Sequence, residues 1–247
     1  MRSSSGRLTT PAPSVVLVRP QKASNLGSVA RVVKNFGLRR LSVVKPAVRP
    51  DEDSGRLATG ADDVLEAISR FATLEDAVAQ YPIVVTTSSL RGRGKTRTLE
   101  LPELPGFLSE SPRGPVAFVF GPERSGLTED ELARSSACLR LPTDPAFPTM
   151  NLSHAVAVVL AVAAAFTSAG TAREAGDALA PAAEIEGAIG HWDRALEAID
   201  FYDTGHRDRS LRDWRRLVAG RPLTTREVAI LRGVANRVLV SLSRKPE

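Results

Sequence analysis

The sequence contains a single cysteine, and this scarcity excludes several classes of protein. One thiol, Cys138, cannot form a disulfide within the chain or supply a two-cysteine metal or redox motif. We therefore expect a protein of the reducing cytoplasm that binds no metal. Because Cys138 lies in a short apolar run, we expect it to be buried as a small hydrophobic residue.

The sequence also lacks an apolar run of the length that a membrane span requires. The longest run, from Ala155 to Phe166, has twelve residues, whereas a spanning helix needs about 18 or more. The first residues, MRSSSGRLTTPAPS, contain two arginines but not the apolar core of a secretory signal. We expect residues 1–13 to be a disordered leader, and the apolar run to be a buried helix.

Acidic residues are scarce at the C-terminal end of the chain. Residues 205–247 contain eleven basic residues, ten of them arginine, and four acidic ones, so this segment has a net charge of +7. The rest of the chain has a net charge of −2, and the excess positive charge is therefore confined to the end. The preference for arginine favours phosphate contacts, as in nucleic-acid binding, over a merely solvated helical face.

The remaining sequence is typical of an α/β domain. The chain has 247 residues, of which 43% are hydrophobic and 25% charged, as in globular proteins. Short branched runs predict buried strands, and patterned segments between them, such as residues 25–37 and 127–135, predict helices. This alternation indicates a mostly parallel sheet with helices on both faces. The predicted strands are residues 14–19, 41–46, 82–88, 115–121 and 137–142.

The pattern changes after residue 167. Residues 168–183 are rich in alanine and glycine and predict a linker that follows an α/β domain of residues 14–167. The last part of the chain, residues 184–247, predicts a small, basic, helical extension. Its predicted helices are residues 184–202, 210–220 and 224–242.

Two stretches place polar residues and glycines where strands of a parallel sheet end, which is where such sheets bind ligands. ASNLGSVARVVKNFG, residues 23–37, has Asn25 at the start of a predicted helix and Arg31 further along it. AFVFGPERSGLTEDEL, residues 117–132, has Glu123 directly after a predicted strand. Taken singly, the first is also typical of a capped amphipathic helix and the second of an ordinary turn.

A third stretch, LRLPTDPAFPTMNLSHAVAVVL, places a proline-rich loop between a strand and the apolar helix. Pro142, Pro145 and Pro148 stiffen this loop, so its backbone groups are held in place at little entropic cost on binding. Asn151 or Ser153 can cap the helix that follows. Capping explains one polar residue here, but it does not explain the whole rigid loop.

In this order, the three stretches resemble the sequence motifs of the SPOUT class of RNA methyltransferases, in its TrmH-like branch. The resemblance covers residues 15 to 166, and WRRLVAGRPLTTREVAILRGV resembles the helical extension of the bacterial tRNA 2′-O-methyltransferases in this branch. It implies a mostly parallel α/β sheet tied into a trefoil knot, an exception to the rule against knots. It also implies a homodimer that methylates a ribose 2′-hydroxyl of tRNA in the anticodon loop, at position 32.

The same resemblance implies the cofactor and the residues that bind it. The cofactor would be S-adenosylmethionine, with S-adenosylhomocysteine as product, held mostly by backbone groups after three strands and in the proline-rich loop. The residues concerned are Thr87, Ser88, Ser89, Gly121, Leu141, Pro148, Thr149 and Met150.

The resemblance further implies a catalytic arginine, Arg31, that reaches the active site from the second subunit. Because an arginine stays protonated, we expect it to act with an RNA phosphate or by electrostatic orientation of the hydroxyl. Asn25, Glu123 and Asn151 are expected to complete the catalytic constellation.

We expect RNA contacts from the loop RGRGKTR, residues 91–97, and from the extension, although a solvated loop is the alternative for the first. The predicted RNA-binding residues are Arg91, Arg93, Lys95, Arg97, Arg212, Arg215 and Arg216.

Three other functions are compatible with parts of the sequence. SLRGRGKT, residues 89–96, ends like a nucleotide-binding P-loop, but Ser89 stands where the first glycine is required and no clear helix follows. A ribosomal RNA 2′-O-methyltransferase, including those that confer antibiotic resistance, would share the same motifs. A non-catalytic RNA-binding module would need the basic extension but neither Arg31 nor Glu123, and it would not bind S-adenosylmethionine.

Overall fold

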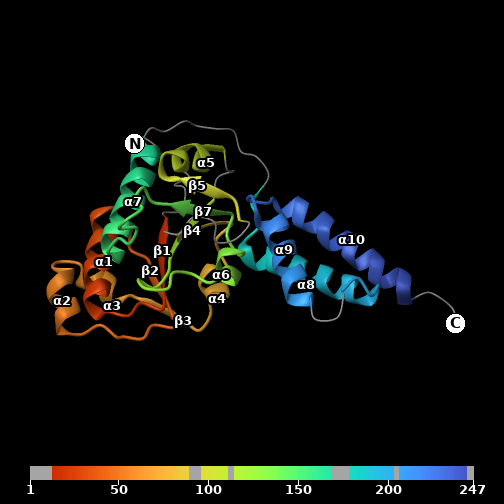
Figure 1. The fold of residues 1–247 in the computed structure, drawn as a ribbon, viewed down its shortest axis with the longest axis horizontal. Coiled ribbons are helices and arrows are strands. Elements are labelled where there is room, and N and C mark those ends of the chain that lie inside the picture. Colours follow the sequence, from red (N-terminus) through yellow and green to blue (C-terminus); the bar gives the residue numbers. More distant parts are fainter. Residues whose placement is uncertain (1–12, 89–95, 111–113, 169–177, 203–205, 244–247) are drawn as a thin grey trace, which may run out of the picture.

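The structure is a computed structural model, and it describes residues 13–88, 96–110, 114–168, 178–202 and 206–243 (Figure 1). The strands are β1 (Ser14–Val18), β2 (Leu41–Val44), β3 (Ser69–Phe71), β4 (Ile83–Ser88), β5 (Thr98–Glu100), β6 (Val116–Phe120) and β7 (Ala137–Arg140). The helices of the sheet domain are α1 (Ala23–Asn35), α2 (Glu52–Ala58), α3 (Asp62–Glu66), α4 (Leu74–Val78), the short 3-10 turn η1 (Leu101–Glu103), α5 (Leu104–Glu110), α6 (Glu129–Leu132) and α7 (Leu152–Ser168). The C-terminal helices are α8 (Ala182–Ala198), α9 (Arg207–Ala219) and α10 (Thr225–Ser243).

The strands form one parallel sheet in the order β3-β2-β1-β6-β4-β7-β5. Each of the five predicted strands is present, and the predicted α/β class with a mostly parallel sheet is confirmed. The late strands β6 and β7 lie between strands that precede them in the sequence. This order brings the ends of β4, β6 and β7 together at one edge of the sheet.

Alternate residues of the central strands point into two hydrophobic cores, one on each face of the sheet. Val15 and Leu17 pack with α1, α5 and α7, while Val16 and Val18 pack with α4 and with Leu132 of α6. Cys138 is 5% exposed and belongs to the second core, as predicted, and burial raises the pKa of its thiol. The apolar run after residue 151 is a helix, α7, whose inner face is buried against α1. No helix in the described ranges is long and apolar enough to cross a membrane.

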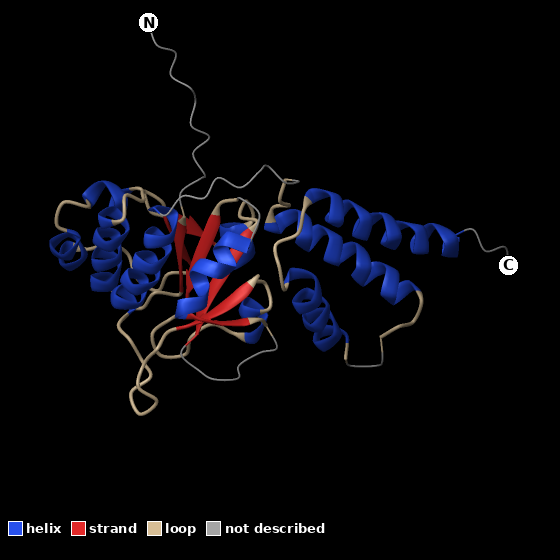
Figure 2. Cartoon of the chain, turned by 90° about the horizontal axis from the view of Figure 1, so that it is seen from above, coloured by secondary structure: helices blue, strands red, loops and turns tan. Residues whose placement is uncertain are grey.

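The three C-terminal helices form a separate bundle beside the sheet (Figures 1 and 2). Their own small core includes Ile185, Ile189, Val218 and Val228, and it is flanked by stacked tryptophans, Trp192 and Trp214, with ring centroids 5.3 Å apart. The bundle is joined to the sheet domain through backbone bonds, because the N–H groups of Ala182 and Ala183 donate to the carbonyls that follow α4. The extension is therefore attached on the α4 side of the sheet.

Candidate active site

The carboxyl ends of three neighbouring strands define the site. Thr87 and Ser88 end β4 and pair in register with Leu139 and Arg140 of β7. On the other side, β4 pairs with β6, and the hydroxyl of Thr87 donates to the carbonyl of Val119 at 3.2 Å. Four of the residues expected to bind the cofactor, Thr87, Ser88, Gly121 and Leu141, therefore end or directly follow adjacent strands. Ser89, predicted with them, lies outside the described residues.

The loop after β6 is folded tightly on itself, and this requires glycine at position 121. A Cβ atom at Gly121 would lie 2.6 Å from the backbone nitrogen of Leu127 and 2.7 Å from the carbonyl carbon of Gly126. Gly126 has a φ of +65°, and its N–H donates to the carbonyl of Pro122 at 2.9 Å. The glycines thus allow the chain to turn back between β6 and α6, with Glu123 inside the turn.

The proline-rich loop between β7 and α7 is held by its own hydrogen bonds. The hydroxyl of Thr143 donates to the carbonyl of Pro148 at 3.1 Å, and the carboxylate of Asp144 accepts from the N–H of Ala146 at 2.7 Å. Leu141 and Met150, at its two ends, pack against the hydrophobic core, while Thr149 is exposed. The loop is therefore preorganised, as the prolines predicted.

Three polar residues from the three motifs form one hydrogen-bonded chain. The amide of Asn151 accepts from both the N–H and the hydroxyl of Ser153, at 2.9 and 2.8 Å, which caps α7. Its other atom, Nδ2, donates to Oδ1 of Asn25 at 3.3 Å, and Nδ2 of Asn25 donates to Oε1 of Glu123. The hydrogen bonds that cap α7 therefore fix the orientation of the amide groups of Asn151 and Asn25, and Asn25 connects them to the carboxylate of Glu123.

Glu123 has one oxygen left at the end of this chain. Its Oε2 is buried and has no hydrogen-bond partner among the described residues. Buried carboxylate oxygens are normally paired, so this oxygen needs a hydrogen-bond donor, which a water molecule or a ligand can supply. Asn25, which is 5% exposed, holds the other oxygen in place. In the described ranges, no group of three or more His, Cys, Asp or Glu side chains is placed to hold a metal ion.

Arg31, the fourth predicted catalytic residue, is not part of this chain. It lies on α1 six residues after Asn25, about 9 Å along the helix axis, and is exposed. In the part of the chain that the structure describes, its side chain makes no ion pair and no hydrogen bond. The structure thus brings together three of the four predicted catalytic residues and leaves Arg31 on the outer surface of the subunit.

Gly27 has a packing role that the sequence did not reveal. A Cβ atom at this position would lie 1.9 Å from the backbone oxygen of Ser54, because α2 crosses α1 here. The glycine of the first motif therefore permits close contact between two helices. Taken alone, the sequence of this stretch was as typical of a capped helix as of a ligand-binding turn, and only the crossing of α2, which comes from distant residues, shows the contact.

No sequence pattern predicted the ion pair between Arg19 and Glu131, which lies near the site. Arg19 directly follows β1 with a φ of +49° and forms a two-pronged ion pair with Glu131 of α6. Burial alone would raise the pKa of Glu131, but the hydrogen bonds from Arg19 and Thr128 hold that pKa below its usual range. The pair joins the end of β1 to the helix that follows the Glu123 loop. No local motif marks it, because the two residues are separated by more than a hundred positions.

The predicted RNA-binding residues lie in different surroundings. Arg91, Arg93 and Lys95 fall outside the described residues, and Arg97 is exposed with its guanidinium over the ring of Phe107. The three predicted arginines of α9 all make ion pairs within the chain. The pairs are Arg212 with Asp130 at 3.4 Å, Arg215 with Glu186 at 3.2 Å, and Arg216 with Glu129 at 3.6 Å and with Asp213 at 3.0 Å.

Comparison with known proteins identifies both parts of the chain. Residues 12–161 match the model of the SpoU rRNA Methylase family, and residues 183–247 match that of the tRNA methyltransferase TrmJ, C-terminal domain. The tRNA (cytidine/uridine-2′-O-)-methyltransferase TrmJ of Cronobacter sakazakii is 34% identical, over 94% of this chain and 98% of that protein.

Solved structures agree with this relationship. The crystal structure of TrmJ from Z. mobilis ZM4 has a TM-score of 0.80 and 31% identity, and the match covers 92% of this chain and 99% of that one. The SpoU methyltransferase AviRb from Streptomyces viridochromogenes, solved in complex with AdoMet, shares the fold with a TM-score of 0.53 at 18% identity. That match covers 66% of this chain and 63% of AviRb.

Proposed function

The chain belongs to the SpoU methylase family and, within it, to the TrmJ group, and we propose that it methylates a ribose 2′-hydroxyl in the anticodon loop of tRNA, at position 32. The observation that carries the catalytic part of this proposal is the chain from Asn151 through Asn25 to Glu123 with its open acceptor oxygen. The C-terminal domain, shared with TrmJ over residues 183–247, supports tRNA as the substrate class.

The residues at the strand ends fit S-adenosylmethionine. Leu141 and Met150 offer apolar surface for the adenine, and the hydroxyls of Thr87 and Ser88 with the backbone groups of the glycine and proline loops offer polar contacts. AviRb, which has the same fold, binds this cofactor. When bound, S-adenosylmethionine supplies an electrophilic methyl group. The backbone-rich loops can hold it without a charged side chain.

The polar chain orients the nucleophile in this proposal. A ribose hydroxyl is a weak nucleophile until its proton leaves, so the site has to hold it in line and accept its hydrogen. In this proposal Oε2 of Glu123 accepts from the hydroxyl; Asn25 occupies the other carboxylate oxygen, Asn151 fixes Asn25, and Oε2 has no partner among the described residues, all of which support this role. Asn25 and Asn151 therefore act by keeping Glu123 in one orientation.

Arg31 acts across a subunit interface in the same proposal. Its exposed position, without a partner in the described part of this chain, is what a residue that serves a second copy requires. The homodimer would place Arg31 beside the hydroxyl and a phosphate of the RNA, where its fixed positive charge stabilises the oxygen that loses its proton.

The test is methyl transfer from radiolabelled S-adenosylmethionine to tRNA and to ribosomal RNA from a strain that lacks the protein. We expect label in tRNA, as a 2′-O-methyl group, and none in ribosomal RNA. Asn25→Ala should lower the transfer by about tenfold or more, which corresponds to about 1.4 kcal/mol of transition-state stabilisation. Label only in ribosomal RNA would contradict the substrate, and binding of RNA without any transfer would contradict the reaction.

A further inference from the structure

Two arginines of α9, Arg212 and Arg216, lie against the segment that follows the Glu123 loop. Residues 127–136 connect the Glu123 loop to β7, and α6 occupies the first part of this segment. Glu129 and Asp130, in the first turn of α6, face Arg216 and Arg212 of the extension. The next acid, Glu131, faces the opposite way and pairs with Arg19 at the end of β1. One short helix therefore contacts both the extension and the end of β1.

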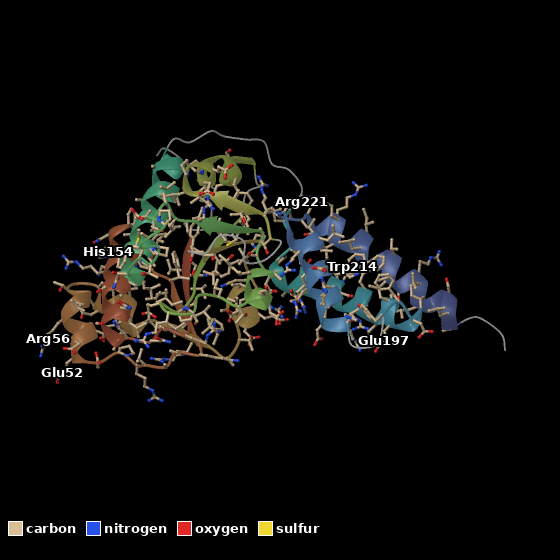
Figure 3. All side chains as sticks on the ribbon, in the orientation of Figure 1. Glu52, Arg56, His154, Glu197, Trp214 and Arg221 are labelled. Carbon is tan, nitrogen blue, oxygen red and sulfur yellow. The ribbon has the colours of Figure 1, made fainter. Side chains whose placement is uncertain are left out.

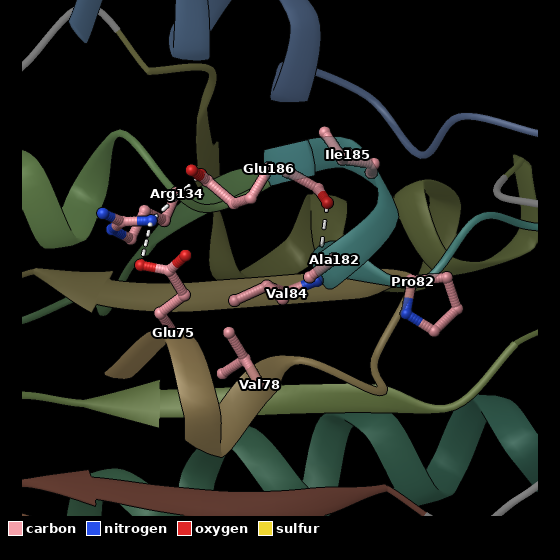
Figure 4. A pocket seen from close by; sticks show the side chains of 9 residues that line it. Glu75, Val78, Pro82, Val84, Arg134, Ala182, Ile185 and Glu186 are labelled. Atoms are coloured by element: carbon pink, nitrogen blue, oxygen red, sulfur yellow. Dashed lines mark hydrogen bonds and ion pairs between the residues drawn. The ribbon is translucent and has the colours of Figure 1, made fainter. Parts of the chain in front are cut away.

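A more buried cluster fixes the extension next to the same segment. Arg134, two residues after α6, pairs with Glu75 of α4 at 3.2 Å and with Glu186 of α8 at 3.0 Å (Figure 4). Glu186 also pairs with Arg215, and the side chains of Arg134, Glu186 and Arg215 are only 21%, 17% and 18% exposed. Ion pairs with this little exposure are screened by salt much less than surface pairs.

Arg216 is likewise an ion-paired arginine with little exposure to solvent. Its side chain is 11% exposed, and it is held by Asp213 on its own helix and by Glu129 on α6. An arginine that contacts the RNA backbone needs an open guanidinium, whereas this one is largely covered by protein. By contrast, Arg226 and Arg237 of α10 are exposed and make no ion pair among the described residues.

Glu131 connects α6 to the loop that carries Glu123. The carboxylate of Glu131 also accepts from the N–H of Thr128 at 2.8 Å, which fixes the start of α6 directly after Leu127. Leu127 is buried and lies against Gly121, and Glu123 in the same loop is tied to Asn25. A displacement of α6 would therefore move the loop that carries Gly121 and Glu123.

We infer that Arg212 and Arg216 are positioning residues that hold the extension against α6, with Arg215 supporting them through Glu186 and Arg134, and so keep the 121–126 loop in its active arrangement. This inference rests on the proposed function, since it concerns the same site. It assigns these arginines a contact with protein carboxylates in place of the RNA phosphates that the sequence alone suggested. The RNA-facing surface of the extension is then the exposed side of α10.

A charge-swap experiment tests the inference. The variant Arg212→Glu/Arg216→Glu places acids against Glu129 and Asp130, and the variant Glu129→Arg/Asp130→Arg places arginines against arginines. The four-substitution variant that combines them restores opposite charges with reversed polarity. Arg226→Glu/Arg237→Glu is the control, because it changes the net charge of the extension by the same amount away from α6. Each full-length variant is measured by calorimetric titration with S-adenosylmethionine in the absence of RNA, by hydrogen exchange of residues 121–128, and by its affinity for tRNA.

We expect Arg212→Glu/Arg216→Glu to bind S-adenosylmethionine about threefold to tenfold more weakly, because two attractive pairs of modest strength become repulsive. Its 121–128 segment should exchange faster, and the combined variant should recover both properties. The control should keep the wild-type affinity for the cofactor and the wild-type exchange.

Two results would overturn the inference. One is unchanged cofactor affinity and exchange in Arg212→Glu/Arg216→Glu, with tRNA affinity lowered as much as in the control. The other is failure of the combined variant to recover when its thermal unfolding shows that it is folded. Failure of the proposed function is a separate outcome, because it would appear as a wild-type protein that transfers no methyl group to tRNA while the exchange measurements still apply.

Discussion

At the scale of single residues, the site depends on glycines that no larger residue can replace and on two amide side chains whose oxygen and nitrogen atoms are both hydrogen-bonded. Gly121 and Gly27 are required by backbone that approaches within van der Waals contact, although only the first lies at the cofactor end of the sheet. Asn25 and Asn151 each use both ends of the amide, so neither can rotate without loss of a hydrogen bond. The carboxylate of Glu123 is thus oriented by residues that also link it to the cap of α7.

Gly27→Ala should destabilise the protein by about 3 kcal/mol, because the added methyl group overlaps the backbone of Ser54, which cannot rotate away as a side chain can. Chemical denaturation measures the change in the free energy of unfolding. Gly55→Ala is the matched control: nothing lies within 4 Å of its added Cβ, so it should stabilise α2 by about 0.5–1 kcal/mol. Equal stability of the two variants would show that α1 and α2 do not cross as closely as described.

At the scale of helices and strands, the sequence predicted the elements that build the site. The five predicted strands and the three predicted helices of the extension match the structure, because short branched apolar runs and clear helical patterns determine them. The strands β3 and β5 were missed, since each has three residues and no pattern can show in so short a segment. The ion pairs of α9 were also missed, because their acidic partners lie on α6 and α8, elsewhere in the sequence.

The start of α10 should make stability depend on acidic pH. The hydrogen bond from Arg221, with further ones from Thr224, lowers the pKa of Glu227 to about 2. Since a carboxyl in the unfolded chain has a pKa near 4.5, Glu227 stabilises the fold above that value and loses its effect as the pH falls from 4.5 towards 2. The melting temperature of Glu227→Gln should therefore lie below that of the wild type at neutral pH, and the two should converge near pH 2. A difference that is constant with pH would refute this assignment.

The exposed side of α10 should account for the salt dependence of tRNA binding. Arg226 and Arg237 lie on one face of this helix, three turns apart, and are open to solvent. Arg226→Ala/Arg237→Ala should weaken tRNA binding and reduce the slope of log K against log salt by about 1–2, since each lost phosphate contact contributes about 0.7–0.9. Arg56→Ala, on α2 at the end of the molecule away from the extension (Figure 3), is the control and should leave the slope unchanged. An unchanged slope in the double variant would remove α10 from the RNA interface.

At the scale of the whole molecule, the proposed active site requires two subunits. The polar chain of Asn151, Asn25 and Glu123 is complete within one subunit, whereas Arg31 points away from it on the same helix as Asn25. The resemblance to a known family suggested this division of the site, and the geometry of one chain is compatible with it. The activity of the whole enzyme should therefore be recoverable from two defective copies.

Mixed dimers give this test. Arg31→Ala and Glu123→Ala should each be inactive as homodimers, and refolded equal mixtures should show about a quarter of the wild-type activity, because half of the dimers are mixed and each of these has one intact site of two. Methyl transfer to tRNA is the measurement, with unmixed variants at the same total concentration as the control. No recovery, in mixtures shown by tagged copies to contain mixed dimers, would place Arg31 outside the partner's site.

Methylation at position 32 can be tested with a tRNA in which the ribose of this nucleotide lacks its 2′-hydroxyl. We predict that the wild-type enzyme transfers radiolabelled methyl to the unmodified tRNA and none to this single-deoxy tRNA, while both bind with similar affinity. Binding of both without a difference in transfer would show that the methyl group goes to another position, and the site would then need a different substrate than the one proposed.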